Sequence, residues 1–307
     1  MRLAHILAAL SVLASAASTA QPQTPQGAND TIVVTGTAAD REEEHKKAVD
    51  FVRRTGVARG LKPAARWDGP VCPKAIGIAP VYARLVEAKV REIAGAAGAK
   101  VARTPCRTNI AVTFATDAGA VVRKIVSRAP GRIAEVPMNR HDALKTGDAP
   151  IRWWYSTDTL DRNGMPALDG APPWTSGNAE GGGSALPTTG SGSFTAPGAS
   201  IISTRQMRAL RTATVIVDLK RAEGVPLDAV ASYAAIVGLA EMSVLSPAPT
   251  DSILALFERE DAPTAPTDED MALLRALYRL PLDREARQHR GLLTRSLVAE
   301  KMGEKKD

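Results

Sequence analysis

One stretch of nearly unbroken apolar residues constrains the fold more than any other feature of the chain. Residues 226–243 read PLDAVASYAAIVGLAEMS, with Asp228 and Glu241 as the only charged side chains. Pro226 suits the first turn of a helix, where its missing N–H is no loss. A helix that is apolar on almost every side has to be buried, so other elements must surround it.

The rest of the chain alternates between helical and strand-like patterns. Apolar spacing with proline starts and glycine stops predicts helices, and β-branched alternation predicts strands. The expected helices are residues 39–59, 80–97, 117–129, 267–280 and 283–302, and the expected strands are residues 109–117, 151–158, 199–210 and 211–221. This mixture predicts an α+β fold in which a mixed sheet and several helices enclose the apolar helix.

Composition predicts one main domain with a long insertion. We expect a single α+β domain over residues 39–282, a size that one hydrophobic core can support. A Gly/Ser/Pro-rich loop at about residues 162–200 interrupts it, with too little apolar surface to order itself and no phosphate-loop spacing. Residues 283–307 are expected to form a basic C-terminal helix and tail.

The first residues have the composition of a secretory signal peptide over residues 1–20. Arg2 precedes an apolar run, and Ser18 and Ala20 occupy the −3 and −1 positions of a cleavage site. We therefore expect cleavage after Ala20, a flexible leader over residues 21–38, and a periplasmic or secreted location. No later stretch is long and apolar enough to cross a bilayer.

The chain contains two cysteines, Cys72 and Cys106. In an oxidising compartment a lone pair of cysteines usually forms a disulfide, and this one would join the two ends of the helix expected over residues 80–97. A redox or metal-binding pair is the other interpretation. The wide spacing and the lack of a nearby histidine make it the weaker one.

The order of elements in the second half resembles that of the zincin metallopeptidases, especially the matrixins. A strand leads into the apolar helix, and Ser252-Ile253-Leu254 then stands where those enzymes have a turn near Ser-Ile-Met. An Asp-rich cap and a closing helix follow from Asp268 to Tyr278. The resemblance covers roughly residues 65–280 and implies a zincin-like mixed sheet, with helix 226–243 in the position of the active-site helix.

The zinc-binding motif of those enzymes is absent. With Leu239 aligned to the leucine of the motif, the three ligand positions fall on Tyr233, Val237 and Ser243, and the general-base position falls on Ala234. Valine and alanine can neither bind zinc nor move a proton. The resemblance therefore implies a degenerate metal site, and we predict a zincin-like pseudoenzyme with no metal, no cofactor and no catalytic residue.

The chain also resembles a group of uncharacterised secreted proteins from alphaproteobacteria. The shared segments are PVCP at residues 70–73, a Cys-x-x-Asn from Cys106 to Asn109, and a V-x-VD strand from Val215 to Asp218. This second resemblance implies an envelope or extracellular location and a fold. It implies no activity.

Aromatic residues and one aspartate have two interpretations each. Tyr233, Tyr278 and the WWY of residues 153–155 could line a ligand groove, but packing between a sheet and helices is the favoured interpretation. Asp218 ends a hydrophobic strand and could be catalytic. We favour a structural role, in which it accepts hydrogen bonds from the backbone of the loop that follows.

Taken together, these patterns predict a non-catalytic binding or interaction protein whose partner is a protein or peptide of the cell envelope. One alternative is a hydrolase, for which Glu241 and Asp251 are a candidate acid–base pair, although solvated charges at helix ends are commoner. Another is an envelope structural factor that contacts the membrane through residues 283–307. The net charge of +6 is too modest to indicate a nucleic-acid partner.

Overall fold

The computed structural model describes residues 38–161 and 206–303. The predicted signal peptide, almost all of the leader and the Gly/Ser/Pro-rich loop lie outside the described residues. The elements in chain order are α1 (Ala38–Thr55), β1 (Ala65–Arg66), β2 (Pro73–Ile76), α2 (Pro80–Ala97), β3 (Ile110–Ala115), α3 (Ala118–Arg128), η1 (Pro130–Ile133), α4 (Met138–Thr146), β4 (Ile151–Asp161), β5 (Gln206–Asp218), α5 (Leu227–Leu239), η2 (Ile253–Ala255), α6 (Asp268–Arg279) and α7 (Ala286–Lys301). They confirm the predicted α+β class.

The sheet is organised around its longest strand, β5. Along one edge β5 pairs in parallel with β1, where Ala65 lies opposite Arg208, and then with β3, where Ile110 lies opposite Ala213. Along its other edge it pairs with β4 in antiparallel fashion over the whole length of β4. Strand β2 pairs in parallel with β3. The sheet is therefore mostly parallel, with one antiparallel strand at its border.

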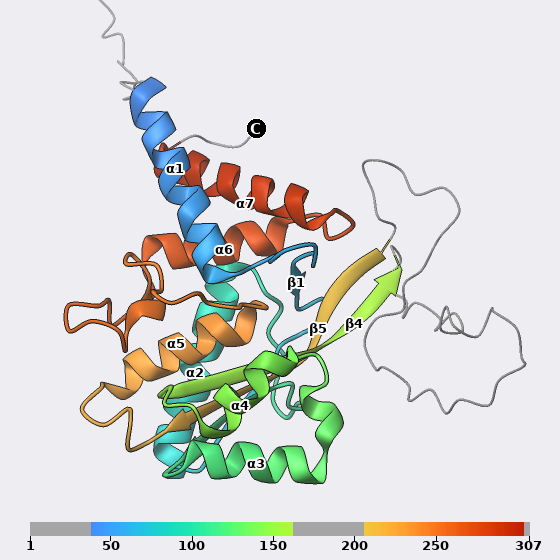
Figure 1. The fold of residues 1–307 in the computed structure, drawn as a ribbon, viewed down its shortest axis with the longest axis vertical. Helices are drawn as coiled ribbons and strands as arrows, with labels where there is room; N and C mark the ends of the chain where they lie inside the picture. The colour runs from blue at the N-terminus through green and yellow to red at the C-terminus, as the bar shows by residue number, and fades with distance from the viewer. Residues whose placement is uncertain (1–37, 162–205, 304–307) are drawn as a thin grey trace, which may run out of the picture. The chain divides into compact units, whose positions relative to one another are not determined.

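Helices cover both faces of this sheet (Figure 1). Residues of β5 alternate between the two faces, as the pleat requires. Val215 and Val217 lie in the large core shared with α2, α5 and α6, while Ile216 lies in a smaller cluster with Trp154 of β4 and residues of α3 and α4. The large core therefore forms on the face that holds α5.

Helix α5 is the buried centre of the large core. Every residue from Ala229 to Leu239 is buried, which confirms the prediction of an enclosed helix. The helix ends at Leu239 rather than at residue 243, because Ala240 adopts an extended backbone and forms an isolated bridge with Arg66. The last residues of the predicted helix therefore belong to an extended segment, and this segment lines the site described below.

The last three helices close the domain around α5. Thr267 and Asp270 form a reciprocal capping box at the start of α6. Asp270 also accepts hydrogen bonds from the Ser252 hydroxyl and from the Ile253 N–H, so it ties η2 to α6. Helix α7 packs on α1 and α6 with Leu293, Leu297 and Val298 buried.

Two local expectations differ from the structure. The segments 199–210 and 211–221 were expected to be separate strands, but residues 206–218 form the single strand β5 and residues 219–221 form a turn. Two charged residues, Arg208 and Arg211, break the apolar alternation without ending the strand. Arg208 pairs with Glu241 just after α5, and Arg211 pairs with Asp158 of β4. The short strands β1 and β2 and the helix α4 were not expected, because they have too few residues to show a period.

The predicted disulfide is present between Cys72 and Cys106, whose Cα atoms are 6.1 Å apart. It joins the segments on either side of α2, as expected. A disulfide of this kind is compatible with a secreted or periplasmic protein. Within the described residues no helix combines the length and the apolar character needed to span a membrane.

Candidate functional site

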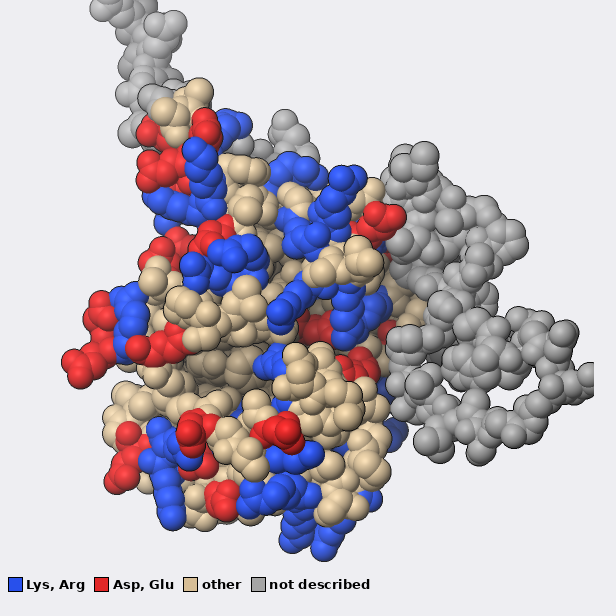
Figure 2. Space-filling view, viewed as in Figure 1, with Lys and Arg blue, Asp and Glu red and all other residues tan. Residues whose placement is uncertain are grey.

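A cavity of about 340 Å³ opens where four segments meet at the end of α5. Its walls are the loop after α1 (residues 56–62), the segment from η1 into α4 (residues 135–144), residues 153–155 of β4, and residues 241–243 after α5. In the space-filling view, basic and acidic side chains gather beside a hollow on the face where α4 lies in front (Figure 2). We call this cavity the α5–β4 cavity.

Backbone contacts fix the wall that follows α5. The N–H of Ser243 donates to the Thr55 carbonyl at 3.2 Å, and the N–H of Leu245 donates to the Arg54 carbonyl at 2.8 Å. Gly56 allows this close approach, because its φ is +69° and a Cβ there would lie 2.1 Å from the Ser243 carbonyl oxygen. The end of α1 therefore sets the position of Ser243.

Two carboxylates and Lys62 on the wall of the cavity form a paired network with Arg208 of β5 beside it. Glu241 accepts from Arg208 at 2.5 Å and from Lys62 at 2.6 Å. Glu135 lies 3.8 Å from Arg208 and 3.9 Å from Lys62. It also accepts hydrogen bonds from the backbone and hydroxyl of Thr157 on β4. Each carboxylate is thus shared by the same two cations.

The environment of Glu241 keeps its carboxylate ionised. Burial by itself would raise the pKa of Glu241, but hydrogen bonds and charge from Arg208 and Lys62 outweigh it and hold that pKa below its usual value. A general acid needs a raised pKa. Glu241 therefore anchors the network and is poorly suited to donate a proton at neutral pH. Asp251, its partner in the candidate acid–base pair, lines a different cavity, so the two carboxylates do not share one site.

Two further arginines enter the cavity from separate segments. Arg140 of α4 donates to the Ser243 hydroxyl at 2.8 Å, and Arg59 of the loop after α1 donates to the same oxygen at 3.2 Å. Among the residues that the structure describes, neither arginine forms an ion pair. The Arg59 loop is held from α7, because Arg290 donates to the carbonyls of Ala58 and Gly60.

The fourth wall is the edge strand β4. Trp153 donates from its indole N–H to the Met242 carbonyl at 3.2 Å, and the Tyr155 hydroxyl donates to the Val237 carbonyl at 2.7 Å while accepting from the Met242 N–H. Burial raises the pKa of Tyr155 well above its usual value, so this hydroxyl stays protonated. These bonds attach β4 to the last turn of α5 and to the segment after it.

The four positions predicted as a degenerate metal site lie partly in the core and partly in the wall of the cavity. Tyr233 packs edge-on against Trp153 and Phe257, with ring centroids 5.9 and 5.8 Å away. Ala234 and Val237 are fully buried in the core. Ser243 lies beyond the helix and lines the α5–β4 cavity. Within the described residues, no three His, Cys, Asp or Glu side chains gather in a way that could hold a metal ion.

The other candidate residues, the aromatic side chains and Asp218, have structural roles in packing and in hydrogen bonds to the backbone. Tyr278 donates to the Leu239 carbonyl, and Trp154 and Tyr155 are buried, so packing accounts for most of the aromatic residues. Asp218 is buried and accepts from the Arg221 N–H in the following loop, as favoured, and from the Ala118 N–H at the start of α3. The expectation that Glu241 is a solvated helix-end charge is wrong, because two cations enclose it.

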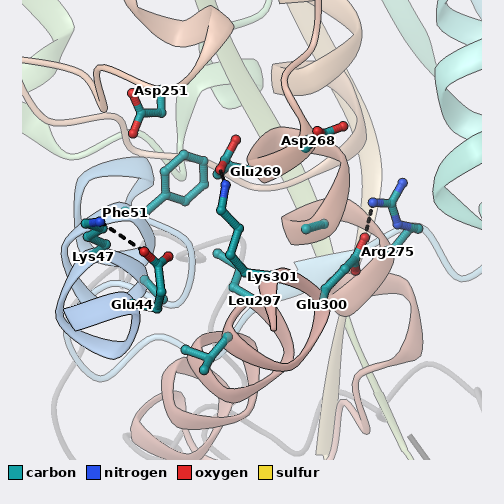
Figure 3. Close-up of a pocket in the computed structure, with 13 residues that line it drawn as sticks. Glu44, Lys47, Phe51, Asp251, Asp268, Glu269, Arg275, Leu297, Glu300 and Lys301 are labelled. Atoms are coloured by element: carbon teal, nitrogen blue, oxygen red, sulfur yellow. Dashed lines mark hydrogen bonds and ion pairs between the residues drawn. The ribbon is translucent and has the colours of Figure 1, made fainter. Parts of the chain in front are cut away.

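A second cavity of about 430 Å³ lies between α1, α6 and α7 (Figure 3). Its basic groups are already paired with acidic groups of the same cavity. Lys47 lies 2.9 Å from Glu44, and Lys301 lies 2.7 Å from Glu269. Arg275 pairs with Glu300. Among the described residues that line this second cavity, no basic group is left unpaired for a ligand, which distinguishes it from the α5–β4 cavity.

The chain matches no protein-family model, no curated protein and no solved structure. The site is therefore interpreted from its own geometry. The sequence pointed to Glu241 and Ser243 for other reasons, but it carried no signal for Arg59 or Arg140. Those residues lie in a loop and in a short helix, 184 and 103 positions from Ser243, so only the fold brings them together.

Proposed function

We propose that this protein is a peptide-binding protein of the periplasm or cell exterior, and that its ligand lies in the α5–β4 cavity as a short extended strand beside β4. The observation that carries the proposal is an open strand edge on the wall of a cavity with fixed polar groups. Peptides commonly bind proteins by adding a strand to such an edge.

The hydrogen-bond pattern identifies which backbone groups of β4 point outward. The Asp218 N–H donates to the Pro150 carbonyl, so these two residues lie opposite each other and their backbone groups point into the space between the two chain segments. Backbone direction alternates along a strand, so Trp153 and Tyr155 direct their N–H and C=O groups away from β5. Both residues line the cavity. No hydrogen bond within the described residues reaches these four groups.

The opposite edge of the sheet is closed to a further strand. Pro73 of β2 has no N–H, and the N–H of Ala75 is taken by the Glu87 carboxylate of α2 at 3.0 Å. On β4 the same kind of cap is present at Thr157, whose N–H donates to Glu135. Within the described residues, the part of β4 beside the cavity is therefore an uncapped part of the sheet border.

A binding role fits the site better than a hydrolytic role. The ionised Glu241 is enclosed by cations, and the Ser243 hydroxyl accepts from two guanidinium groups, which leaves it without a base among the described residues. The zincin-like layout remains a prediction. It is supported by the order of β5, the buried α5, η2 capped by Ser252, and α6. If the layout is zincin-like, the residues at the ligand and base positions of α5 imply a protein that binds peptides and does not hydrolyse them.

The membrane alternative has less support from the structure. Leu293, Leu297 and Val298, the apolar residues of the C-terminal helix, pack against the rest of the domain. An amphipathic helix needs a free apolar face to enter a membrane surface. In α7 this face is already used inside the protein.

Equilibrium dialysis of the full mature chain against a pool of labelled random heptapeptides tests the proposed function. We expect retained peptides whose binding is lost when single backbone N–H groups are methylated. Asn139→Trp fills the cavity from α4, while Asp142→Trp adds the same ring to an exposed position of α4 outside the cavity. The proposal fails if no peptide is retained or if the two variants bind peptides equally well.

A further inference from the structure

The charges of the α5–β4 cavity do not balance. Glu135 and Glu241 each lie within ion-pair distance of both Lys62 and Arg208, so two cations already compensate the two carboxylates. Arg59 and Arg140 remain, and the structure gives them only the neutral hydroxyl of Ser243 within the described residues. Two like charges held against one neutral oxygen repel each other, and an anion between them removes that repulsion.

The fold fixes the backbone positions of both arginines. Arg140 lies in the first turn of α4 and is partly buried. Arg59 lies in a loop whose carbonyl groups on either side, at Ala58 and Gly60, accept hydrogen bonds from Arg290. Ser243 is fixed by its backbone bond to Thr55. An anion at this position therefore meets side chains whose backbone positions are already fixed, which lowers the entropic cost of binding.

We propose that Arg59 and Arg140 form an oxyanion site for a carboxylate of the peptide ligand, with the Ser243 hydroxyl as an additional donor. The planar guanidinium group matches the geometry of a carboxylate and can bind it through two parallel hydrogen bonds. The carboxylate is either the C-terminus of the peptide or an Asp or Glu side chain. A phosphate group presents similar oxygens, so the experiment below distinguishes it.

The oxyanion site and the open edge of β4 share one cavity. Arg59, Arg140 and Ser243 line it together with Trp153 and Tyr155. A strand added beside Trp153 would therefore present one end or one side chain to the arginines. This inference rests on the proposed function for the peptide, but the oxyanion site itself can be tested without any peptide.

The first arm of the experiment measures thermal unfolding of the full mature chain in sodium acetate, sodium phosphate and sodium chloride at equal ionic strength. We expect acetate to stabilise the wild type and to have no such effect on Arg59→Gln/Arg140→Gln. Arg53→Gln is the matched control, because this arginine is exposed on α1 and pairs with Asp50 outside the cavity. It should respond like the wild type.

The second arm compares each retained peptide with its amide and with Asp or Glu residues changed to Asn or Gln. We expect removal of one carboxylate to weaken binding about tenfold or more, as the loss of a charge-assisted pair does. Arg140→Gln should weaken binding of the acid form by a similar factor and leave the amide form nearly unchanged.

The possible outcomes separate the two proposals. Equal affinity of acid and neutral peptides, with binding still blocked by Asn139→Trp, would overturn the oxyanion site and leave the peptide-binding function in place. Stabilisation by acetate through the two arginines without any peptide binding would support the oxyanion site and refute the peptide function. Stabilisation by phosphate alone would overturn the assignment to a carboxylate.

Discussion

Replacing Glu241 by glutamine removes one charge from the network beside the cavity and keeps the shape of the side chain. The side chains of Glu241 and Arg208 are 16% and 14% exposed, so their hydrogen bonds are largely shielded from water. Removing one partner of such a pair typically costs about 3–5 kcal/mol. Arg208 would keep Glu135 at 3.8 Å and the hydroxyl of Thr157. We therefore expect the free energy of unfolding to fall by about 2–3 kcal/mol.

Urea unfolding followed by tryptophan fluorescence measures this loss, with the slope of the transition checked for constancy. Glu43→Gln is the matched control, because it breaks an exposed pair with Lys47 and should leave stability unchanged within error. The lowered pKa of Glu241 also determines how its contribution to stability changes with pH. Its contribution is complete above the ordinary pKa of 4.5 and is lost as the pH falls through the lowered folded pKa. A loss below about 1 kcal/mol at neutral pH, or an equal loss in the control, would refute the reasoning.

Three other predictions follow from features outside the cavity. The double change Cys72→Ser/Cys106→Ser should lower the free energy of unfolding by about 3–4 kcal/mol, because the bridge restricts the unfolded chain over a separation of 34 residues. Reductant should no longer affect the urea unfolding of this variant. Asp270→Asn should lower the free energy of unfolding by about 2–3 kcal/mol, because an amide cannot accept all the hydrogen bonds that reach the carboxylate. A smaller loss than that of an exposed Asp→Asn change would contradict this expectation. Burial lowers the pKa of His289, so the neutral ring stabilises the fold above pH 6.5, and this stabilisation is lost as the pH falls through the lowered pKa. We therefore expect His289→Gln to flatten the pH dependence of the free energy of unfolding below pH 6.5. An unchanged slope would argue against this role.

The sequence predicted those parts of the fold that have a long local signal. Helix α2 has both a proline start and a glycine stop, and Gly98 indeed adopts the left-handed conformation expected there. Helix α6 has its capping box, and α5 has an apolar composition that allows no exposed face. In each case neighbouring residues alone predict that the helix forms, although the end of α5 is set by the bridge between Ala240 and Arg66.

The site could not be predicted in the same way, because its residues acquire a role only through distant contacts. Glu241 looks like a solvated acid until the fold places Arg208 and Lys62 beside it. Arg59 and Arg140 resemble many other exposed arginines in the sequence. The two-residue strand β1 is likewise defined only by its pairing with β5. The resemblance to the metallopeptidase motif placed the predicted site on α5, while the polar groups of the cavity lie in the segment just beyond its end.

The position of β5 in the sheet has a consequence for the order of folding. Strands β1, β3 and β4 each pair with β5, and β2 joins the sheet only through β3. The pairings of Ala65 with Arg208 and of Ile110 with Ala213 close very long loops, which is slow. A growing chain therefore cannot assemble its sheet until residue 218 has been made. If the predicted signal peptide directs export in an unfolded state, this late strand delays folding while the chain is still being recognised for transport.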